Sequence, residues 1–264
     1  MKAIIRWTLW QRRLSVIWWS IGVAGFIFLN MIFYPSFKDQ AAELQKSFES
    51  IPDAAIQLMG GSADFFSPIG FLNSQVYFIM LPMLFGILAI GLGSSLLARD
   101  EQDRTIELLL ARPLPRSSLL FGKALAGAII VFIVSIMSLL ATIIAAAMVD
   151  LEVGVWPMVS ATFACVLLVL TFGAIAFALT ATGRARGASL GVASVIAIGG
   201  YVVSSLAGTV TWLAGPSKFF PFYYYQPEAI LRGVFEWYNL LYFVGAILLL
   251  AVFSWISFRR RDLA

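Results

Sequence analysis

The chain lacks histidine altogether, has a single cysteine and is poor in charge. Of its 264 residues, 12% are charged and 61% are hydrophobic. The missing histidine removes the commonest metal ligand and general base, which excludes a histidine-dependent membrane serine protease and an H-E-x-x-H zinc protease. The lone Cys165 stands in an apolar run, which excludes an internal disulfide and a cysteine-based zinc site. The P-loop is missing too, because Ala124 follows Gly122-Lys123 and no glycine stands five residues before Gly122.

The apolar excess predicts an all-α integral membrane protein built as a single transmembrane domain over residues 1–264. The mean hydropathy is +0.91, and a soluble domain of this length needs far more polar surface. Spans of 20 or more apolar residues are expected at residues 14–34, 75–98, 119–149, 155–182, 188–214 and 240–258. Pro82 predicts a kink in the second span, since its ring removes one backbone hydrogen bond.

The positions of lysine and arginine predict the orientation. Fourteen of the 18 basic residues fall on one side of a six-span topology: Lys2, Arg6, Arg12, Arg13, Arg99, Arg104, Arg112, Arg116, Lys123, Arg184, Arg186, Arg259, Arg260 and Arg261. The other side has Lys38, Lys46, Lys218 and Arg232. The positive-inside rule therefore places both termini in the cytoplasm. Because these residues are scattered between apolar spans instead of forming one polar face, no nucleic-acid partner is expected.

By these boundaries the middle of every span lacks Asp, Glu, Lys and Arg. A proton- or ion-coupled carrier usually holds such groups at membrane depth. An ion-gradient-driven carrier would thus lack an obvious coupling site, and energy for uphill transport would come from another subunit.

Three polar segments lie outside the spans. Residues 2–14 place Ala3, Trp7, Trp10 and Leu14 on one stripe, which predicts an N-terminal helix lying in the inner interface. The acidic outer loop predicts a short helix at residues 39–50. The aromatic outer stretch 219–237 either dips back into the membrane surface or forms an ordinary aromatic belt.

The second cytoplasmic loop, residues 99–116, is the most informative segment. Its residues 100–110 predict a short helix with acidic residues in the first turn, where the helix dipole favours them. Asp100, Arg104 and Glu107 share one face. Ile106, Leu109 and Leu110 make an adjacent apolar face. The other interpretation of this loop is a fully solvated connector, but Ile106 and the Leu108–Leu110 run are too apolar for that. They should therefore lie on the membrane or on a partner.

This loop resembles the cytoplasmic loop of ATP-binding-cassette (ABC) permeases of the second, exporter-type class. The family pattern is an acidic cluster, Gly-Thr-x-Glu, a leucine-rich step and then Pro-x-x-Arg. It is matched in order and spacing by Glu101, Thr105, Glu107, Leu108, Leu109, Leu110, Pro113 and Arg116, with Arg104 where glycine is often found. The family also tends to have six spans, an amphipathic N-terminal helix and an outer Pro-Phe-Tyr-Tyr-type stretch, like residues 221–225 here.

The resemblance implies a non-catalytic half-transporter of the bacterial cell membrane. Two permease copies, as a homodimer or a related heterodimer, would pair in the lipid above two separate ATPase subunits that bind the ATP, so this chain needs no cofactor of its own. The loop would be the coupling helix in a cleft of the ATPase, through Asp100, Glu101, Arg104, Thr105, Ile106, Glu107, Leu109, Leu110, Pro113 and Arg116. Such permeases mostly export drugs, antimicrobial peptides, lipids or polysaccharide intermediates.

Two other functions compete with this one. One is an ion-gradient-driven secondary carrier or channel, which dependence on an ion gradient without an ATPase would favour. The other is a membrane-embedded enzyme or assembly factor, for which the sequence offers only ordinary carboxylates such as Glu228 and Glu236.

A pair of glycines starts the fifth span. Gly187 and Gly191 are four residues apart, and small residues at this spacing let helix backbones approach closely in lipid. The pair therefore predicts a helix-packing site at the inner end of this span, unless it is simply tolerated in a lipid-facing turn.

Overall fold

The computed structural model describes residues 1–40, 51–60, 65, 67–99 and 115–261, which contain helices and no strand. Six helical segments are long and apolar enough to cross a membrane: Lys2–Lys38, Pro68–Ser95, Arg116–Met148, Val155–Ala181, Arg186–Leu206 and Trp237–Arg260. The all-α membrane fold and the six spans are thus confirmed.

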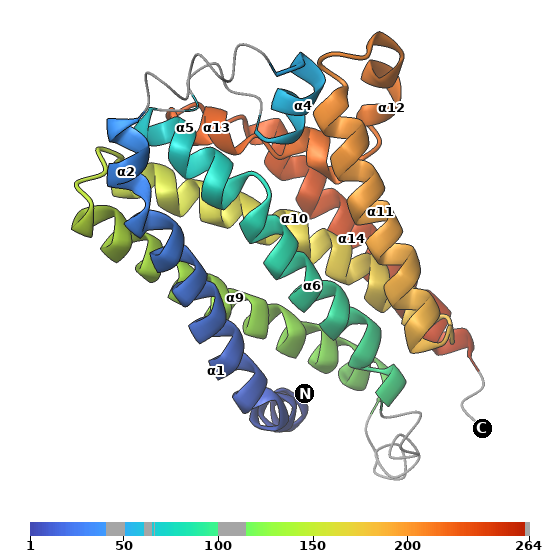
Figure 1. The fold of residues 1–264 in the computed structure, drawn as a ribbon. Coiled ribbons are helices and arrows are strands. Elements are labelled where there is room, and N and C mark those ends of the chain that lie inside the picture. The colour runs from blue at the N-terminus through green and yellow to red at the C-terminus, as the bar shows by residue number, and fades with distance from the viewer. Residues whose placement is uncertain (41–50, 61–64, 66, 100–114, 262–264) are drawn as a thin grey trace.

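The six spans form one bundle with both termini at the same end (Figure 1). At that end α6 (Met80–Ser95) stops and α9 (Arg116–Met148) starts. The opposite end carries the short helices α2 (Tyr34–Asp39), α4 (Asp53–Leu58), α5 (Pro68–Leu72), α12 (Ala214–Ser217) and α13 (Pro227–Leu231). We call the end that carries both termini the inner end, and the end with the short helices the outer end.

α10 (Val155–Ala181) is the centre of the bundle and contacts α6, α9, α11 (Arg186–Leu206) and α14 (Trp237–Arg260). Its large side chain Phe172 is buried, as are Phe85 of α6 and Phe243 of α14. The second and fourth spans are the most buried of the six, whereas α1 (Lys2–Ile32), α11 and α14 keep broad exposed apolar faces. Those faces are where lipid or another chain must lie.

The N-terminal segment and the first span are one continuous helix, α1, rather than two. In Figure 1 its turns beside the N label are seen almost end-on, whereas the rest runs along the picture, so the helix changes direction. The predicted stripe points outward, with Trp7, Trp10 and Leu14 all more than half exposed. The opposite face carries Ile4, which packs against Gly122 of α9. An apolar stripe turned away from the bundle suits the predicted interfacial position.

The second span starts earlier than expected and is irregular. Ser67 caps α5 by accepting a hydrogen bond from the Gly70 nitrogen at 3.0 Å. The π-helix η1 (Asn73–Tyr77) follows, and a turn at residues 78–79 separates it from α6. Pro82 accounts for the turn, since it has no N–H for the carbonyl of Phe78 four residues earlier. The predicted kink is therefore a break in the helix.

One predicted helix lies outside the described residues, and one predicted span ends earlier than expected. The helix expected at residues 39–50 falls almost wholly outside the described residues, while α2 and α4 flank that stretch. The fifth span ends at Leu206 instead of residue 214, because the chain turns after it and Val210 is extended. The 3-10 helix η2 (Thr211–Leu213) and α12 follow, then the 3-10 helix η3 (Pro221–Tyr224) and α13.

Candidate functional site

The described residues that flank the segment predicted to bind an ATPase lie at the inner end. Nine of the ten predicted coupling residues fall within residues 100–114, outside the described part of the chain: Asp100, Glu101, Arg104, Thr105, Ile106, Glu107, Leu109, Leu110 and Pro113. Arg116, the tenth, is the exposed first residue of α9. Its Nη1 donates a hydrogen bond to the backbone oxygen of Arg261 at 2.9 Å, which ties the start of α9 to the end of α14.

The described residues of the inner end are cationic. They comprise twelve Lys and Arg and no Asp or Glu: Lys2, Arg6, Arg12, Arg13, Arg99, Arg116, Lys123, Arg184, Arg186, Arg259, Arg260 and Arg261. Lys123 is only 4% exposed, and the Arg12 Nη2 donates to Ser95 Oγ of α6 at 3.1 Å. Arg12 thereby links α1 to the last residue of α6, immediately before residues 96–99 and the predicted coupling segment.

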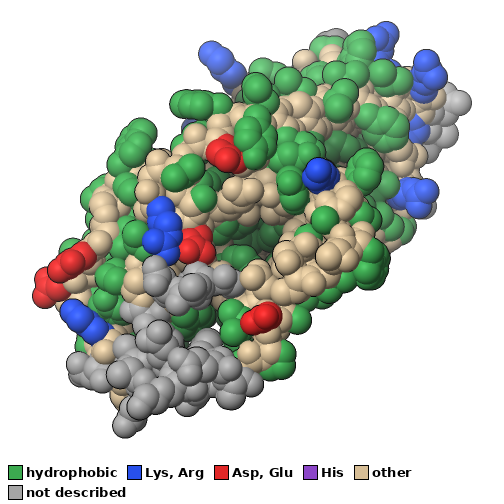
Figure 2. All heavy atoms as spheres, turned by 90° about the horizontal axis from the view of Figure 1, so that it is seen from above, with side chains coloured by type: hydrophobic (Ala, Val, Ile, Leu, Met, Phe, Trp, Pro, Cys, Tyr) green, Lys and Arg blue, Asp and Glu red, His purple; other side chains and the backbone are tan. Residues whose placement is uncertain are grey.

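The outer end is hollowed by a cavity of about 610 Å³ between α4, α11 and the segment that precedes α14. Its lining is aromatic on one part, with Phe78, Tyr201 and Phe222, and polar on another, with Gln57 and Ser204. Figure 2 looks onto this end and shows the hollow, with hydrophobic side chains inside and both signs of charge around it. Such a lining can contact a ligand that is partly apolar and partly polar.

The aromatic stretch 219–237 faces outward at its ends and packs into the bundle in its middle. The outward-facing ends are at Phe219 and Trp237. Its middle packs into the bundle, where Phe222 contacts the rings of Phe172 and Tyr201 with centroids 5.6 and 5.5 Å apart. The two sequence interpretations, a stretch that dips into the membrane surface and an ordinary aromatic belt, both stay predictions.

A buried hydrogen-bond network fastens this stretch to the irregular second span. The Tyr225 hydroxyl donates to the backbone oxygen of Tyr77 at 2.7 Å. The Tyr77 hydroxyl in turn lies 3.2 Å from the Met158 oxygen and 3.0 Å from Thr162 Oγ1, both in α10. Burial raises the pKa of Tyr225 well above its ordinary value, so its phenol stays protonated and remains a donor.

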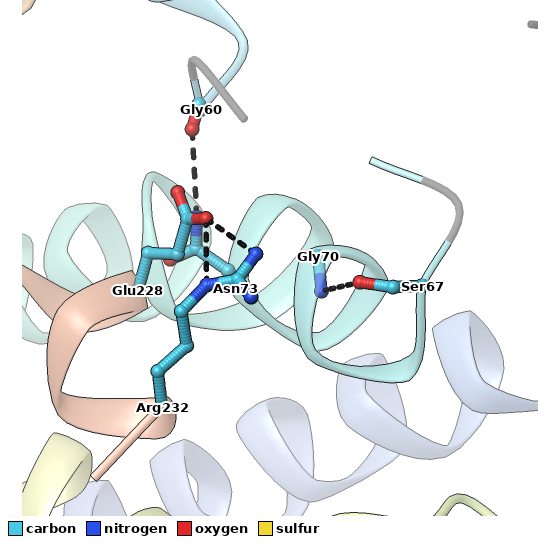
Figure 3. Close-up of polar contacts among 6 residues, drawn as sticks. All are labelled: Gly60, Ser67, Gly70, Asn73, Glu228 and Arg232. Carbon is cyan, nitrogen blue, oxygen red and sulfur yellow. Dashed lines mark hydrogen bonds and ion pairs between the residues drawn. The ribbon is translucent and has the colours of Figure 1, made fainter. Parts of the chain in front are cut away.

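The π-helix also anchors the outer loops (Figure 3). Asn73 is 1% exposed, and its Nδ2 donates to the Gly60 oxygen at 3.5 Å, the long limit of a hydrogen bond. On α13, which contacts η1, Arg232 and Glu228 form an ion pair with Nη2 and Oε1 3.0 Å apart. Gly60 and Glu228 also line the outer cavity. Two segments of the cavity's lining, at Gly60 and on α13, therefore contact η1 of the second span.

Comparison with known proteins identifies the family. A model of the family described as "ABC-2 family transporter protein" matches residues 4–263. The chain belongs to the ABC-2 transporter family. The resemblance seen in the loop thus extends over nearly the whole chain, which is a multi-pass membrane transport subunit. No curated protein and no solved structure matches it.

In this ABC-2 chain residues 96–115 connect α6 to α9 in the sequence, and α6 is packed tightly on α10. A Cβ built on Gly93 of α6 would overlap the backbone oxygen of Gly173 in α10. A Cβ built on Gly173 would in turn lie 3.0 Å from the Ala89 oxygen. Because the two backbones touch, a displacement of α6 at the inner end has to move α10 or slide along it.

This glycine contact was not predicted, and the described residues do not form the predicted one. Nothing in the described structure lies within 4 Å of a Cβ built on Gly187 or Gly191. Their packing role stays a prediction, and it now concerns another copy of the chain. Sequence spacing detects glycines paired along one helix, whereas Gly93 and Gly173 are paired across two helices that are distant in sequence.

Proposed function

We propose that this chain is the permease subunit of an ABC exporter in which a separate ATPase subunit binds and hydrolyses ATP. Two copies, or one copy and a related chain, would form the membrane part. The observation that carries the proposal is the ordered coupling motif of residues 101–116, located in an ABC-2 family member between α6 and α9. The absence of a P-loop from the sequence supports a partner that supplies ATP hydrolysis.

The proposed orientation places the inner end in the cytoplasm of a bacterial cell. It is supported by the charge distribution, because the described residues of the outer end include only Lys38, Lys218 and Arg232 as cations, against twelve at the inner end. An ATPase in the cytoplasm would then meet the coupling segment.

The proposed coupling step starts at the predicted helix 100–110. Ile106, Leu109 and Leu110 would supply the buried contact with the ATPase, because apolar anchors contribute most of an interface's affinity. Glu101, Arg104 and Glu107 would supply the orienting charges, because charges set the register of an interface. Closure of the ATPase would push the ends of α6 and α9. The glycine contact supports a path from α6 to α10, and the Arg116–Arg261 hydrogen bond supports a path from α9 to α14.

The proposed substrate is hydrophobic or amphipathic, such as a drug, an antimicrobial peptide or a lipid. The mixed lining of the outer cavity supports this class, because Phe78 and Tyr201 offer apolar surface beside the amide of Gln57. The network through Tyr225 and Tyr77 joins this cavity to the second span, so a movement of α6 would change the cavity's shape.

Co-purification with the ATPase tests the coupling proposal. Leu109→Asp should weaken ATPase binding by about 2–5 kcal/mol, since it places a charge in a buried contact. Glu107→Lys should leave the permease folded and lower transport into vesicles. Glu152→Lys, an exposed charge reversal at the outer end, is the matched control and should behave like wild type. If both inner variants bind the ATPase and transport normally, residues 100–110 are only a connector.

Thiol labelling tests the orientation independently. Single cysteines at Ser50, Ser117 and Ala264, in a Cys165→Ala background, are exposed to an impermeant reagent in intact cells. Position 50 should react, whereas positions 117 and 264 should react only after lysis. Strong labelling of position 117 in intact cells would reverse the proposed topology.

A further inference from the structure

A second cavity, of about 400 Å³, lies in the inner half of the bundle between α9 and α14. We call it the inner groove. Leu120, Ala124, Ala128 and Val131 of α9 form one of its sides, and α6 and α10 form its floor. Phe121 and Leu125, at its edge on α9, are 41% and 44% exposed. The inner groove is therefore open to the side, where lipid surrounds the bundle.

The inner groove has the depth of one lipid leaflet. From Leu120 to Val131 the helix rises about 16 Å at 1.5 Å per residue. The hydrocarbon core of a bilayer is about 30 Å thick, so one leaflet contributes about 15 Å. Because α9 starts at the inner end and α14 finishes there, the groove runs through the inner leaflet.

The lining of the inner groove favours hydrocarbon over water. Its side chains are apolar except for Ser254 of α14. The Ser254 hydroxyl already donates to the Leu250 oxygen at 2.7 Å. A water molecule needs two to four polar partners, which this surface does not offer.

The inner mouth of the groove is cationic. Arg116 precedes Leu120 by four residues and so lies on the groove side of α9. Its hydrogen bond to the Arg261 backbone brings a second arginine to the same place, beside Arg260 at the end of α14. The Arg261 guanidinium lies against Gly183, just beyond the C-terminal end of α10, which forms the floor of the groove with α6. Cationic pockets between spans at this interface bind anionic lipid headgroups, and arginine matches phosphate oxygens with two parallel hydrogen bonds.

We propose that the inner groove binds an anionic phospholipid of the inner leaflet, with one acyl chain between α9 and α14 and the phosphate at Arg116 and Arg261. The proposal does not depend on what the permease exports. The inner groove combines an apolar lining of leaflet depth with arginines at the end where a lipid headgroup would lie.

Native mass spectrometry of the purified permease tests this site. Wild type should retain phosphatidylglycerol in preference to phosphatidylcholine. Ala128→Trp should fill the groove and remove the retained lipid, and Ile133→Trp, on the same helix outside the groove lining, should not. Arg261→Gln should weaken the binding of phosphatidylglycerol about fivefold, as ~1 kcal/mol per arginine implies. Arg13→Gln should leave this binding unchanged.

The variants are compared only where they elute as a single species. If Ala128→Trp does not fold, Ala251→Leu on the α14 side of the groove takes its place. Equal retention of the two lipids by wild type would overturn the proposal. Retention of phosphatidylglycerol at the wild-type level by both Ala128→Trp and Ala251→Leu would overturn it too. So would a disulfide between copies carrying Ala128→Cys in the Cys165→Ala background, because a second chain would then occupy the groove.

Discussion

Replacing Gly93 by alanine should loosen the centre of the bundle. The added methyl group would overlap the backbone oxygen of Gly173 and lie 3.1 Å from the Cβ of Ala176. A backbone oxygen cannot rotate away as the end of a flexible side chain can, so α6 and α10 must separate. Gly91, two residues earlier on the same helix, has nothing within 4 Å of its Cβ position and provides the matched control.

The magnitude follows from two opposing effects. Inserting a methyl group into a packed core costs about 1–3 kcal/mol. Replacing glycine by alanine within a helix contributes up to about 1 kcal/mol of stabilisation. The second effect is common to Gly93→Ala and Gly91→Ala, so the difference between the two variants isolates the clash, at about 1–3 kcal/mol.

Thermal unfolding in detergent, followed by the loss of monodisperse protein, measures this difference. At about 2–4 °C per kcal/mol, Gly93→Ala should unfold about 2–12 °C below Gly91→Ala. Equal midpoints for the two variants would refute the backbone contact between α6 and α10. A lower midpoint for Gly91→Ala would refute the assignment of which glycine makes it.

Two further variants and one control test the outer network and the proposed dimer. Tyr225→Phe should destabilise the permease by about 1–2 kcal/mol, because the backbone oxygen of Tyr77 loses a buried donor. The control Tyr223→Phe should change stability by less than about 0.5 kcal/mol. Similar unfolding midpoints for the two variants would contradict the network. Gly191→Leu should leave the monomer's unfolding midpoint unchanged, since no described neighbour lies within 4 Å of a Cβ at this position, yet it should lower the fraction of the proposed dimer by light scattering. A dimer fraction equal to that of wild type would contradict the packing role of Gly191.

The sequence alone determined the features that depend on local composition. The number of spans follows from apolar runs long enough to cross a bilayer. The break in the second span follows from Pro82, whose missing N–H is a property of the residue itself. The family was recognisable because its coupling motif, from Glu101 to Arg116, is contiguous in sequence.

Only the tertiary structure decided which faces of the spans meet. In a soluble protein, polar residues mark the outer face of a helix, but here lipid-facing and buried residues are both apolar, as exposed Leu249 and buried Phe243 of α14 illustrate. Hydrophobic periodicity therefore could not predict that Gly93 meets Gly173, or that Tyr225 reaches Tyr77 across 148 positions. Such contacts arise from close packing between distant segments, which local sequence does not encode.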